Sequence, residues 1–390
     1  MSAHTARRPT IAIESTALSF RPATGVSHYS REVFRRVFAL RPDWDFVLTK
    51  LRSEPGVEEW TALPNVRSKR SVMSTRTYHR FFFRGIRFRY DWLTGSRPDL
   101  WVFPRFVRFP VSPSVPSVTF VYDLSFLVVP ECADERNRKY LTDNVQTSVE
   151  RSTSVVTISD YVTSELVELY GMDAGKAVRA YPAVDKDRFY VPSDTAVSAT
   201  LAKHALAPGY LLSVGTLEPR KNVHRLVEAW SGLSPDLQAA HPLVLVGASG
   251  WLNDDLEMLL EPFVEAGSVR RLGYVDDADL VGLYAGAAAF AYLSRYEGFG
   301  MPVLEALACG AACVVASNTS LLEAGGPAVR YVDPGDLDDV RAALTDVLTN
   351  PQTRELLRRQ APSHVSAFDW DASAVAVVDE IERLLQTRQR

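Results

Sequence analysis

The stretch Ser294-Arg-Tyr-Glu-Gly-Phe-Gly-Met-Pro-Val-Leu-Glu-Ala-Leu-Ala-Cys-Gly310 combines carboxylates, glycines and a proline at the predicted start of a helix. Gly298 and Gly300 permit backbone conformations that are closed to other residues. Pro302 suits the first helical position, where a missing N–H group costs nothing. The free amides of such a helix start, together with its positive end, can hold phosphate or sugar oxygens. The stretch therefore predicts a binding site for an oxygen-rich ligand.

The two glutamates of this stretch have different predicted tasks. Glu297 precedes the glycines, and its carboxylate accepts hydrogen bonds from hydroxyl groups such as those of a sugar. Glu305 lies about one turn inside the helix, within reach of a second diol such as a ribose. A structural interpretation stays open, in which Glu305 only complements the helix dipole and the glycines only form a tight loop.

The whole stretch resembles, nearly residue for residue, the E-x7-E signature of the retaining glycosyltransferases of family 4, or group 1, which have the GT-B fold. The resemblance implies that four residues hold the sugar of a nucleotide donor: Glu297 and, through their backbone amides, Gly298, Phe299 and Gly300. It also implies that Glu305 holds the ribose of that donor. The resemblance is strongest from 211 to 318 and weak between 55 and 115.

A second group of residues carries positive charge. Gly215 follows a predicted strand, and Arg220 and Lys221 come just before Asn222, a favoured N-cap residue for the helix that follows. Arginine grips phosphate with a planar fork and lysine adds a point charge, so the pair suits a diphosphate that gains charge as it leaves. Adjacent basic residues are also common on solvated surfaces. The stretch resembles the family's G-x5-K-N motif, which implies that these basic residues contact the donor diphosphate and act with Glu297.

Three residues of the first half complete the predicted donor site. Gly25 opens a helix, and 23–30 resembles the family's first glycine loop, although a simple turn also explains this glycine. Tyr122 and Asp123 stand where family members commonly carry His-Asp. Because a phenol is not a general base near neutral pH, we hypothesise that Tyr122 instead offers an apolar ring edge to a 6-deoxy sugar. Asp123 is equally open to interpretation as a turn residue.

Short β-branched runs alternate with helical patterns along the chain, which is typical of βαβ units and parallel sheets. Strands are expected at 10–13, 45–48, 100–103, 118–121, 155–158, 210–214, 243–246, 269–272, 288–292, 313–316 and 329–332. With the resemblance, the predicted fold is α/β of the GT-B type: two Rossmann-like, doubly wound parallel-sheet domains facing across a cleft. The expected parts are an acceptor-binding domain at 1–187, a linker at 188–207, a sugar-nucleotide-binding domain at 208–367, and a helix at 368–390 that packs back on the first domain.

Composition is consistent with a globular enzyme of two domains. The chain has 390 residues, of which 46% are hydrophobic and 23% are charged. A net charge of −4 gives no reason to expect nucleic-acid binding. Three cysteines and a polar start at 1–9 indicate a cytoplasmic location. The acidic run 276–279 lies at a predicted helix start, where acidic residues ordinarily complement the dipole, so neither a metal ion nor another cofactor is expected.

The stretch 61–90 contains eight basic residues and no acidic residue. Four arginines recur at helical spacing: Arg76, Arg80, Arg84 and Arg87. Aromatic and apolar residues occupy another face, as in helices that lie on anionic membranes. A solvated basic face over an ordinary core stripe explains the same pattern. The sequence thus leaves two interpretations of the Arg76–Arg89 region, and one of them is peripheral contact with the cytoplasmic face of the inner membrane.

Together these features predict a metal-independent, retaining glycosyltransferase that moves a hexose or 6-deoxyhexose, such as mannose or rhamnose, from a nucleotide sugar to an acceptor hydroxyl. The expected acceptor is a glycan or lipid-linked glycan in bacterial polysaccharide (O-antigen, capsule) or glycolipid assembly. One alternative is a non-catalytic sugar-nucleotide-binding or scaffold protein on the same fold. Another is a glycoside hydrolase with carboxyl groups roughly 5–5.5 or 6.5–9.5 Å apart, which would leave the two cations without a role.

Overall fold

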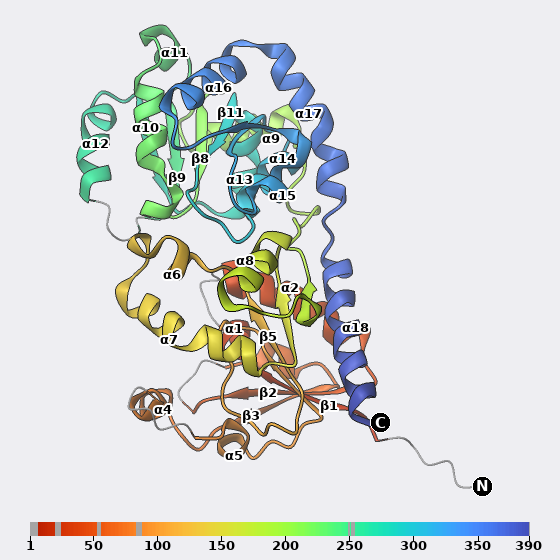
Figure 1. Cartoon of the computed structure of the whole chain (residues 1–390). Helices are drawn as coiled ribbons and strands as arrows, with labels where there is room; N and C mark the ends of the chain where they lie inside the picture. The colour runs from red at the N-terminus through yellow and green to blue at the C-terminus, as the bar shows by residue number, and fades with distance from the viewer. Residues whose placement is uncertain are drawn as a thin grey trace. The chain divides into compact units, whose positions relative to one another are not determined.

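A computed structural model describes residues 7–19, 25–52, 56–82, 88–248, 250 and 254–389. The chain divides into two compact units (Figure 1). The N-terminal unit comprises Met1–Leu124, Lys139–Pro182 and Trp370–Arg390, and the C-terminal unit comprises Ser125–Arg138 and Ala183–Asp369. Each unit has its own parallel sheet.

The unit boundaries differ from the expected ones in two places. Ser125–Arg138 groups with the C-terminal unit although it lies in the first half of the sequence. The segment 188–207, expected as a linker, contains helix α9 (Asp194–Lys203), which packs against α13 (Asp277–Gly286) of the same unit. Its few apolar residues, which include the buried Leu201, are enough to dock a short helix but too few to predict one.

The sheet of the N-terminal unit contains, among the described residues, seven parallel strands in the order β3-β2-β1-β4-β5-β6-β7. Their bounds are β1 Thr10–Glu14, β2 Asp45–Lys50, β3 Val66–Arg70, β4 Leu100–Phe103, β5 Ser117–Val121, β6 Ser154–Thr157 and β7 Ala177–Arg179. Five of these strands match expected ones, whereas β3 and β7 were not expected. Both are edge strands, which need no continuous apolar run.

Helices cover both faces of this sheet. Their bounds are α1 Thr16–Ser19, α2 Gly25–Leu40, α3 Glu58–Thr61, α4 Thr75–Phe82, α5 Tyr90–Thr94, α7 Glu135–Arg151, whose first residues belong to the C-terminal unit, α8 Asp160–Tyr170, η2 Ala174–Lys176 and α18 Trp370–Gln389. On one face Phe38 of α2 packs on Phe46, with ring centroids 4.8 Å apart. Side chains alternate along a strand, so Val47 points to the other face and joins Tyr78, Tyr90 and Trp101.

The last helix, α18, packs against α2 within the N-terminal unit. The ring centroids of Tyr29 and Trp370 are 5.6 Å apart in an edge-to-face contact. Arg36 Nε donates a hydrogen bond to Asp371 Oδ1 at 2.6 Å. The start of the last helix thus makes an aromatic contact and an ion pair with the helix that begins at Gly25.

The sheet of the C-terminal unit contains six described parallel strands in the order β10-β9-β8-β11-β12-β13. Their bounds are β8 Leu211–Val214, β9 Leu243–Val246, β10 Val269–Gly273, β11 Ala289–Tyr292, β12 Cys313–Ala316 and β13 Val329–Val332. All six match expected strands. The remaining elements are α6 Ser125–Val128, η1 Pro130–Cys132, η3 Pro219–Lys221, α10 Val223–Ser231, α11 Pro235–Ala240, α12 Asp254–Glu265, α14 Met301–Ala308, α15 Leu321–Gly325, η4 Gly326–Ala328, α16 Leu337–Thr349 and α17 Pro351–Ser366.

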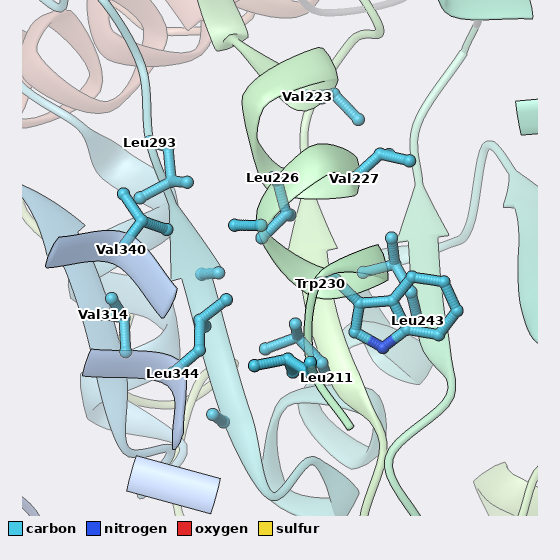
Figure 2. Packing of buried hydrophobic residues seen from close by; sticks show 14 of the residues in the cluster. Leu211, Val223, Leu226, Val227, Trp230, Leu243, Leu293, Val314, Val340 and Leu344 are labelled. Carbon is cyan, nitrogen blue, oxygen red and sulfur yellow. The ribbon is translucent and has the colours of Figure 1, made fainter. Parts of the chain in front are cut away.

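One face of this sheet carries a large apolar core. Figure 2 shows Leu226, Val227 and Trp230 of α10 beside Leu211 and Leu243 of the central strands, with α16 packed next to them. These side chains are almost completely buried, and truncating a buried tryptophan to alanine typically costs about 3–5 kcal/mol. This core fixes α10, and therefore the loop that precedes it, against the sheet.

The strand order of the C-terminal unit creates a switch point between β8 and β11. From β8 the chain moves outward through β9 to β10, and then returns to the opposite side of β8 for β11. Loops that leave the carboxyl ends of such neighbouring strands turn toward opposite faces of the sheet, and open α/β sheets bind ligands between them. The loop after β8 carries Arg220 and Lys221, and the loop after β11 carries Glu297.

Part of the predicted basic helix lies outside the described residues. The structure has α4 over Thr75–Phe82, with Arg76 and Arg80 exposed on it, whereas Arg84 and Arg87 are not described. No helix of the described residues is both long enough and apolar enough to span a bilayer.

Candidate functional site

The Glu297 carboxylate lies at the centre of a polar cluster beyond the carboxyl ends of β8 and β11. Arg220 Nη1 donates to Glu297 Oε2 at 2.8 Å, and Lys221 Nζ donates to Glu297 Oε1 at 2.7 Å. The phenol of Tyr292 donates to the same Oε1 at 3.0 Å and accepts a hydrogen bond from Lys221 Nζ at 2.6 Å. The structure therefore brings together three residues that the sequence predicts for catalysis and adds Tyr292, which sequence reasoning missed.

The guanidinium of Arg220 is held on a second side by Glu218. Arg220 Nη2 donates to Glu218 Oε1 at 2.6 Å, and Arg220 Nη1 also donates to the carbonyl of Tyr296 at 3.0 Å. Glu218 is buried, so its charge depends on Arg220 for a partner. The fork of Arg220 is thus oriented before any ligand arrives, and Glu218 is a second residue that sequence reasoning missed.

Two glycines with positive φ end the neighbouring strands β8 and β9 beside this cluster. Gly215, at the end of β8, has a φ of 149°, and a Cβ built on it would lie 3.6 Å from Lys221 Cε. Gly247, at the end of β9, has a φ of 140°, and a Cβ built there would lie 2.0 Å from the Gly215 carbonyl oxygen. A side chain at Gly247 would therefore push apart the two loops, whereas at Gly215 it is the positive φ that favours glycine.

Asn222 takes a different role from the predicted one. It precedes α10 with a φ of 56°, and its side chain makes no capping hydrogen bond to that helix. Its Nδ2 instead donates to the carbonyl of Leu293 at 3.0 Å, which ties the loop after β8 to the end of β11. A left-handed conformation outside glycine is uncommon and is best tolerated by asparagine. The cross-loop bond therefore replaces the expected cap.

The backbone of Glu297 is fixed by the loop after β12. Its N–H donates to Thr319 Oγ1 at 3.3 Å, and Ser320 Oγ donates to its carbonyl oxygen at 2.7 Å. Thr319 has a φ of 50°, which is rare for a β-branched residue. Of the three described non-glycine residues with a positive φ, Asn222 and Thr319 both lie at this site. Strained backbone of this kind clusters where surrounding contacts enforce a functional geometry.

The glycine-flanked segment forms the start of α14, as the sequence predicts. Gly300 precedes the helix with a φ of 106°, and a Cβ built on it would lie 2.6 Å from Leu321 Cδ2. Met301 is the first helical residue, so Pro302 occupies the second position rather than the first. The ring of Phe299 turns inward onto Phe368, with centroids 5.3 Å apart. Gly298 and Phe299 are buried next to Glu297, and their contact with a donor stays a prediction.

Burial and charge act in opposite directions on Glu297. Burial acts to raise the pKa of its carboxyl, but the charges of Arg220 and Lys221 outweigh burial and hold the pKa at about 2. The pKa of the Tyr292 phenol is raised well above its usual value, chiefly by burial and then by the charge of Glu297. Glu297 is therefore a permanent anion at neutral pH, and Tyr292 is a neutral hydrogen-bond donor to it.

Glu305 has the opposite electrostatic character. Burial raises the pKa of its carboxyl to about 7, although the hydrogen bond donated by Tyr284 at 3.1 Å acts to lower it. Asp277 adds a like charge that raises the pKa further. Glu305 thus titrates near neutral pH, and its assignment to a ribose stays a prediction.

The three predicted residues of the N-terminal unit have different environments. Gly25 is exposed at the start of α2, and a Cβ built on it would meet no described atom within 4 Å. Tyr122 is 3% exposed, and its hydroxyl bonds Ser30 Oγ at 2.9 Å and donates to the carbonyl of Pro104 at 3.0 Å. Asp123 follows it and is partly exposed. Donor contact by these residues stays a prediction, and Tyr122 has the environment of a core residue.

Comparison with known proteins identifies the family. A profile described as "Glycosyl transferases group 1" matches residues 202–364. The O-antigen chain mannosyltransferase B of Escherichia coli is 34% identical over 270 residues, which are 69% of this chain and 70% of that protein. The chain belongs to the glycosyl transferases group 1 family. This glycosyltransferase is also 30% identical over 245 residues to the serotype-specific mannosyltransferase WbdA of E. coli, and it spans only 30% of that protein's length.

Solved structures show the same architecture. Sucrose-phosphate synthase from Thermosynechococcus elongatus superposes with a TM-score of 0.74 at 20% identity, covering 98% of this chain and all of that one. WaaG, a glycosyltransferase involved in lipopolysaccharide biosynthesis, superposes with a TM-score of 0.71 at 16% identity, covering 95% of this chain and 99% of that one. At such identities the likeness shows the fold alone. The glycosyltransferase thus has the GT-B fold, with two Rossmann-like parallel-sheet units.

Replacing Tyr292 by phenylalanine tests its part in positioning Lys221 and Glu297. The Tyr292→Phe variant keeps the ring but loses the hydroxyl that both residues contact. We expect the glycosyl-transfer kcat to fall roughly tenfold, about 1.4 kcal/mol, with a smaller change in the donor KM. The matched control is Tyr331→Phe, because that hydroxyl bonds only backbone carbonyls of α15 among its described contacts. Wild-type kcat in Tyr292→Phe would contradict a positioning role.

The raised pKa of Glu305 predicts a pH-dependent stability. A carboxyl whose pKa rises from 4.5 to about 7 on folding binds its proton more tightly in the folded state. Stability is then lost as the pH rises through this window, by up to about 3 kcal/mol. We therefore expect the melting temperature of the wild type to fall relative to Glu305→Gln between pH 5 and pH 8. A constant difference across that range would show that Glu305 ionises normally.

Proposed function

We propose that the C-terminal unit binds a nucleotide-diphosphate sugar and that the enzyme transfers its hexose to a hydroxyl of a glycan or lipid-linked glycan with retention. The observation that carries this proposal is the Glu297 carboxylate held between Arg220 and Lys221 at the switch point of β8 and β11. A sugar presents hydroxyl donors and a diphosphate presents anionic acceptors. A site that holds the Glu297 carboxylate beside the cations Arg220 and Lys221 complements both ends of such a donor.

The proposed chemistry uses these charges directly. The bond between the anomeric carbon and the diphosphate oxygen breaks, and the acceptor oxygen forms a new bond to that carbon. The proton of the acceptor hydroxyl passes to the leaving phosphate on the same face, so the protein supplies no base. Arg220 and Lys221 stabilise the charge that develops on the diphosphate. Because two cations already meet that charge, we propose that the reaction needs neither a divalent metal nor another cofactor.

We propose mannose as the transferred sugar and O-antigen assembly as the setting. Support comes from the relatives, since both E. coli proteins are mannosyltransferases and the first is an O-antigen enzyme by name. The environment of Tyr122 gives no support to the 6-deoxy sugar hypothesised from the sequence. Its ring edge is buried and its hydroxyl is engaged by Ser30 and Pro104, so neither is offered to a donor in this structure. Three free, buried cysteines fit the expected cytoplasmic location.

A donor panel tests the sugar and the mechanism together. The purified enzyme is incubated with GDP-mannose, UDP-glucose, GDP-fucose and dTDP-rhamnose, with a mannose-terminated acceptor and with or without EDTA. We expect nucleotide-diphosphate release from GDP-mannose, unchanged by EDTA, and an α-linked product by NMR. Preference for a 6-deoxy donor would reject the mannose assignment, and loss of activity in EDTA would reject the metal-free mechanism.

The same panel separates the enzyme from a non-catalytic sugar-nucleotide-binding protein. If calorimetry detects donor binding but no combination of donor and acceptor releases nucleotide diphosphate, the chain is a binding protein. The retained pair of Arg220 and Lys221 supports catalysis instead, because a binding protein needs no residues to stabilise a leaving group. A hydrolase is disfavoured, because hydrolysis by two carboxyl groups would leave the cations Arg220 and Lys221 at Glu297 without a role.

Replacing Glu297 by glutamine should separate transfer from diphosphate binding. In the described structure Glu297 occupies both cations, so a diphosphate must compete with it for them. Glutamine keeps the shape but removes the competing charge. We expect the transfer rate of Glu297→Gln to fall roughly a hundredfold, as when a charged catalytic partner is lost, while its Kd for free GDP decreases.

The matched control is Glu355→Gln, which removes an exposed carboxylate from α17 of the same unit. Isothermal titration with GDP and initial-rate kinetics give the two readouts, and circular dichroism confirms folding. If Glu297→Gln weakens GDP binding in parallel with transfer, the cations do not exchange between Glu297 and the diphosphate.

A further inference from the structure

A cavity of about 570 Å³ lies within the C-terminal unit. Three parts of that unit line it: the segment that leads into α9, the ends of α13 and α14, and α17 (Figure 1). Leu307 and Ala308 end α14 and border the cavity, whereas Gly300 precedes the other end of that helix. Small-molecule sites in proteins have volumes of roughly 300–1,000 Å³, so the cavity has the size of a ligand site. It is separate from the cluster around Glu297, since it shares no described lining residue with that cluster.

The lining of this cavity is mainly apolar. Leu307 is 2% exposed, and Val191 borders the cavity with 70% of its surface exposed. A Cβ built on Gly310 would lie 3.4 Å from Val191 Cγ2, so this valine lies over the turn that ends α14. Cys309 is buried there, and burial raises the pKa of its thiol to about 12, so the thiol is neutral. Withdrawing apolar surface from water stabilises a complex by about 25 cal/mol per Å², which favours a ligand with an apolar body.

Two cations line the same cavity. The Nε of Arg358 donates to the carbonyl of Gly310 at 2.9 Å, which orients its guanidinium, and its terminal nitrogens have no hydrogen-bond partner within the described ranges. Lys186 is exposed and forms no ion pair with any described residue. Asp194 also lines the cavity, but it stands in the first turn of α9, where it complements the helix dipole. The cavity therefore has an excess of positive charge and a guanidinium fork whose geometry matches a carboxylate.

We propose that this cavity binds a small carboxylate with an apolar body. The apolar body packs on Val191, Leu307 and Val365. The carboxylate accepts hydrogen bonds from Arg358, and Lys186 adds a second positive charge. A neutral apolar molecule would place the guanidinium beside apolar atoms, where a charge is costly, and a small hydrophilic anion would leave the apolar lining in water. A ligand with both features satisfies the whole lining, and the proposal does not depend on the donor or the acceptor of the transfer reaction.

Isothermal titration of the full chain with decanoate tests this proposal. Decanol provides the same chain without the charge, and butanoate provides the charge on a shorter chain. We expect decanoate to bind at a single site, decanol to bind roughly tenfold more weakly, and butanoate to bind roughly a hundredfold more weakly.

Three variants separate the charge from the cavity. Arg358→Gln should weaken decanoate binding roughly tenfold and leave decanol binding unchanged, because only the anion loses a charge-assisted hydrogen bond. Lys186→Gln, which removes only an exposed side chain, should weaken decanoate binding roughly threefold. Ala308→Phe should weaken the binding of both compounds, because its ring fills the cavity.

The matched controls lie outside the cavity. Arg359→Gln removes the neighbouring cation of α17, which is exposed and pairs with Glu355, and Ala240→Phe adds a ring to the exposed end of α11. Both should bind decanoate like the wild type, and circular dichroism confirms that each variant folds. Absence of saturable decanoate binding, binding of decanol as tight as that of decanoate, or unchanged binding in Ala308→Phe would each overturn the proposal. So would displacement of decanoate by GDP from both the wild type and Ala308→Phe, because it would place the probe at the donor site.

Discussion

The pairing of Glu297 with Arg220 and Lys221 is the interaction on which the site depends. Bringing these largely buried charges together removes them from water, and such clusters are often no more stable than well-packed apolar replacements. These ion pairs therefore matter to the site because a ligand can take the place of either partner. A ligand that carries both hydroxyl groups and phosphate can replace each half of the pairing with an equivalent contact. Tyr292 and Glu218 keep the charges in place until then.

Topology explains how residues so far apart in the sequence meet. Arg220 and Glu297 follow β8 and β11, which are neighbours only because the chain reverses its direction of travel across the sheet. Asn222 bonds the end of β11 from the loop after β8, and Thr319 bonds Glu297 from the loop after β12. Both take left-handed conformations that are rare outside glycine. The core beneath α10 holds these loops rigidly enough to maintain that strain.

The interior of the fold could be predicted from the sequence because buried parallel strands are short apolar runs. The edge strands of the N-terminal sheet could not, since β3 is charged and mostly exposed and β7 has only three residues. The same distinction applies to the site. Glu297, Arg220 and Lys221 stand in local motifs, whereas Tyr292 acts through a contact between the end of β11 and the loop after β8. Glu218 stands beside Arg220 in the sequence, but its contact depends on the side-chain geometry of that loop. Tyr292 also ends an apolar strand, where a tyrosine is ordinarily read as core.

The two glutamates of one short segment have different protonation behaviour, which their spacing in the sequence does not predict. Glu297 and Glu305 are both largely withdrawn from water, yet the pKa of the first is about 2 and that of the second about 7. The difference comes from the neighbouring groups. At Glu297 the charges of Arg220 and Lys221 lower the pKa against the effect of burial, whereas a neutral phenol and the like charge of Asp277 lie around Glu305. Glu297 is therefore fixed as an acceptor and competes with any phosphate for its cations. Glu305 can accept or donate near neutral pH, so the two carboxyl groups cannot serve the donor in the same way.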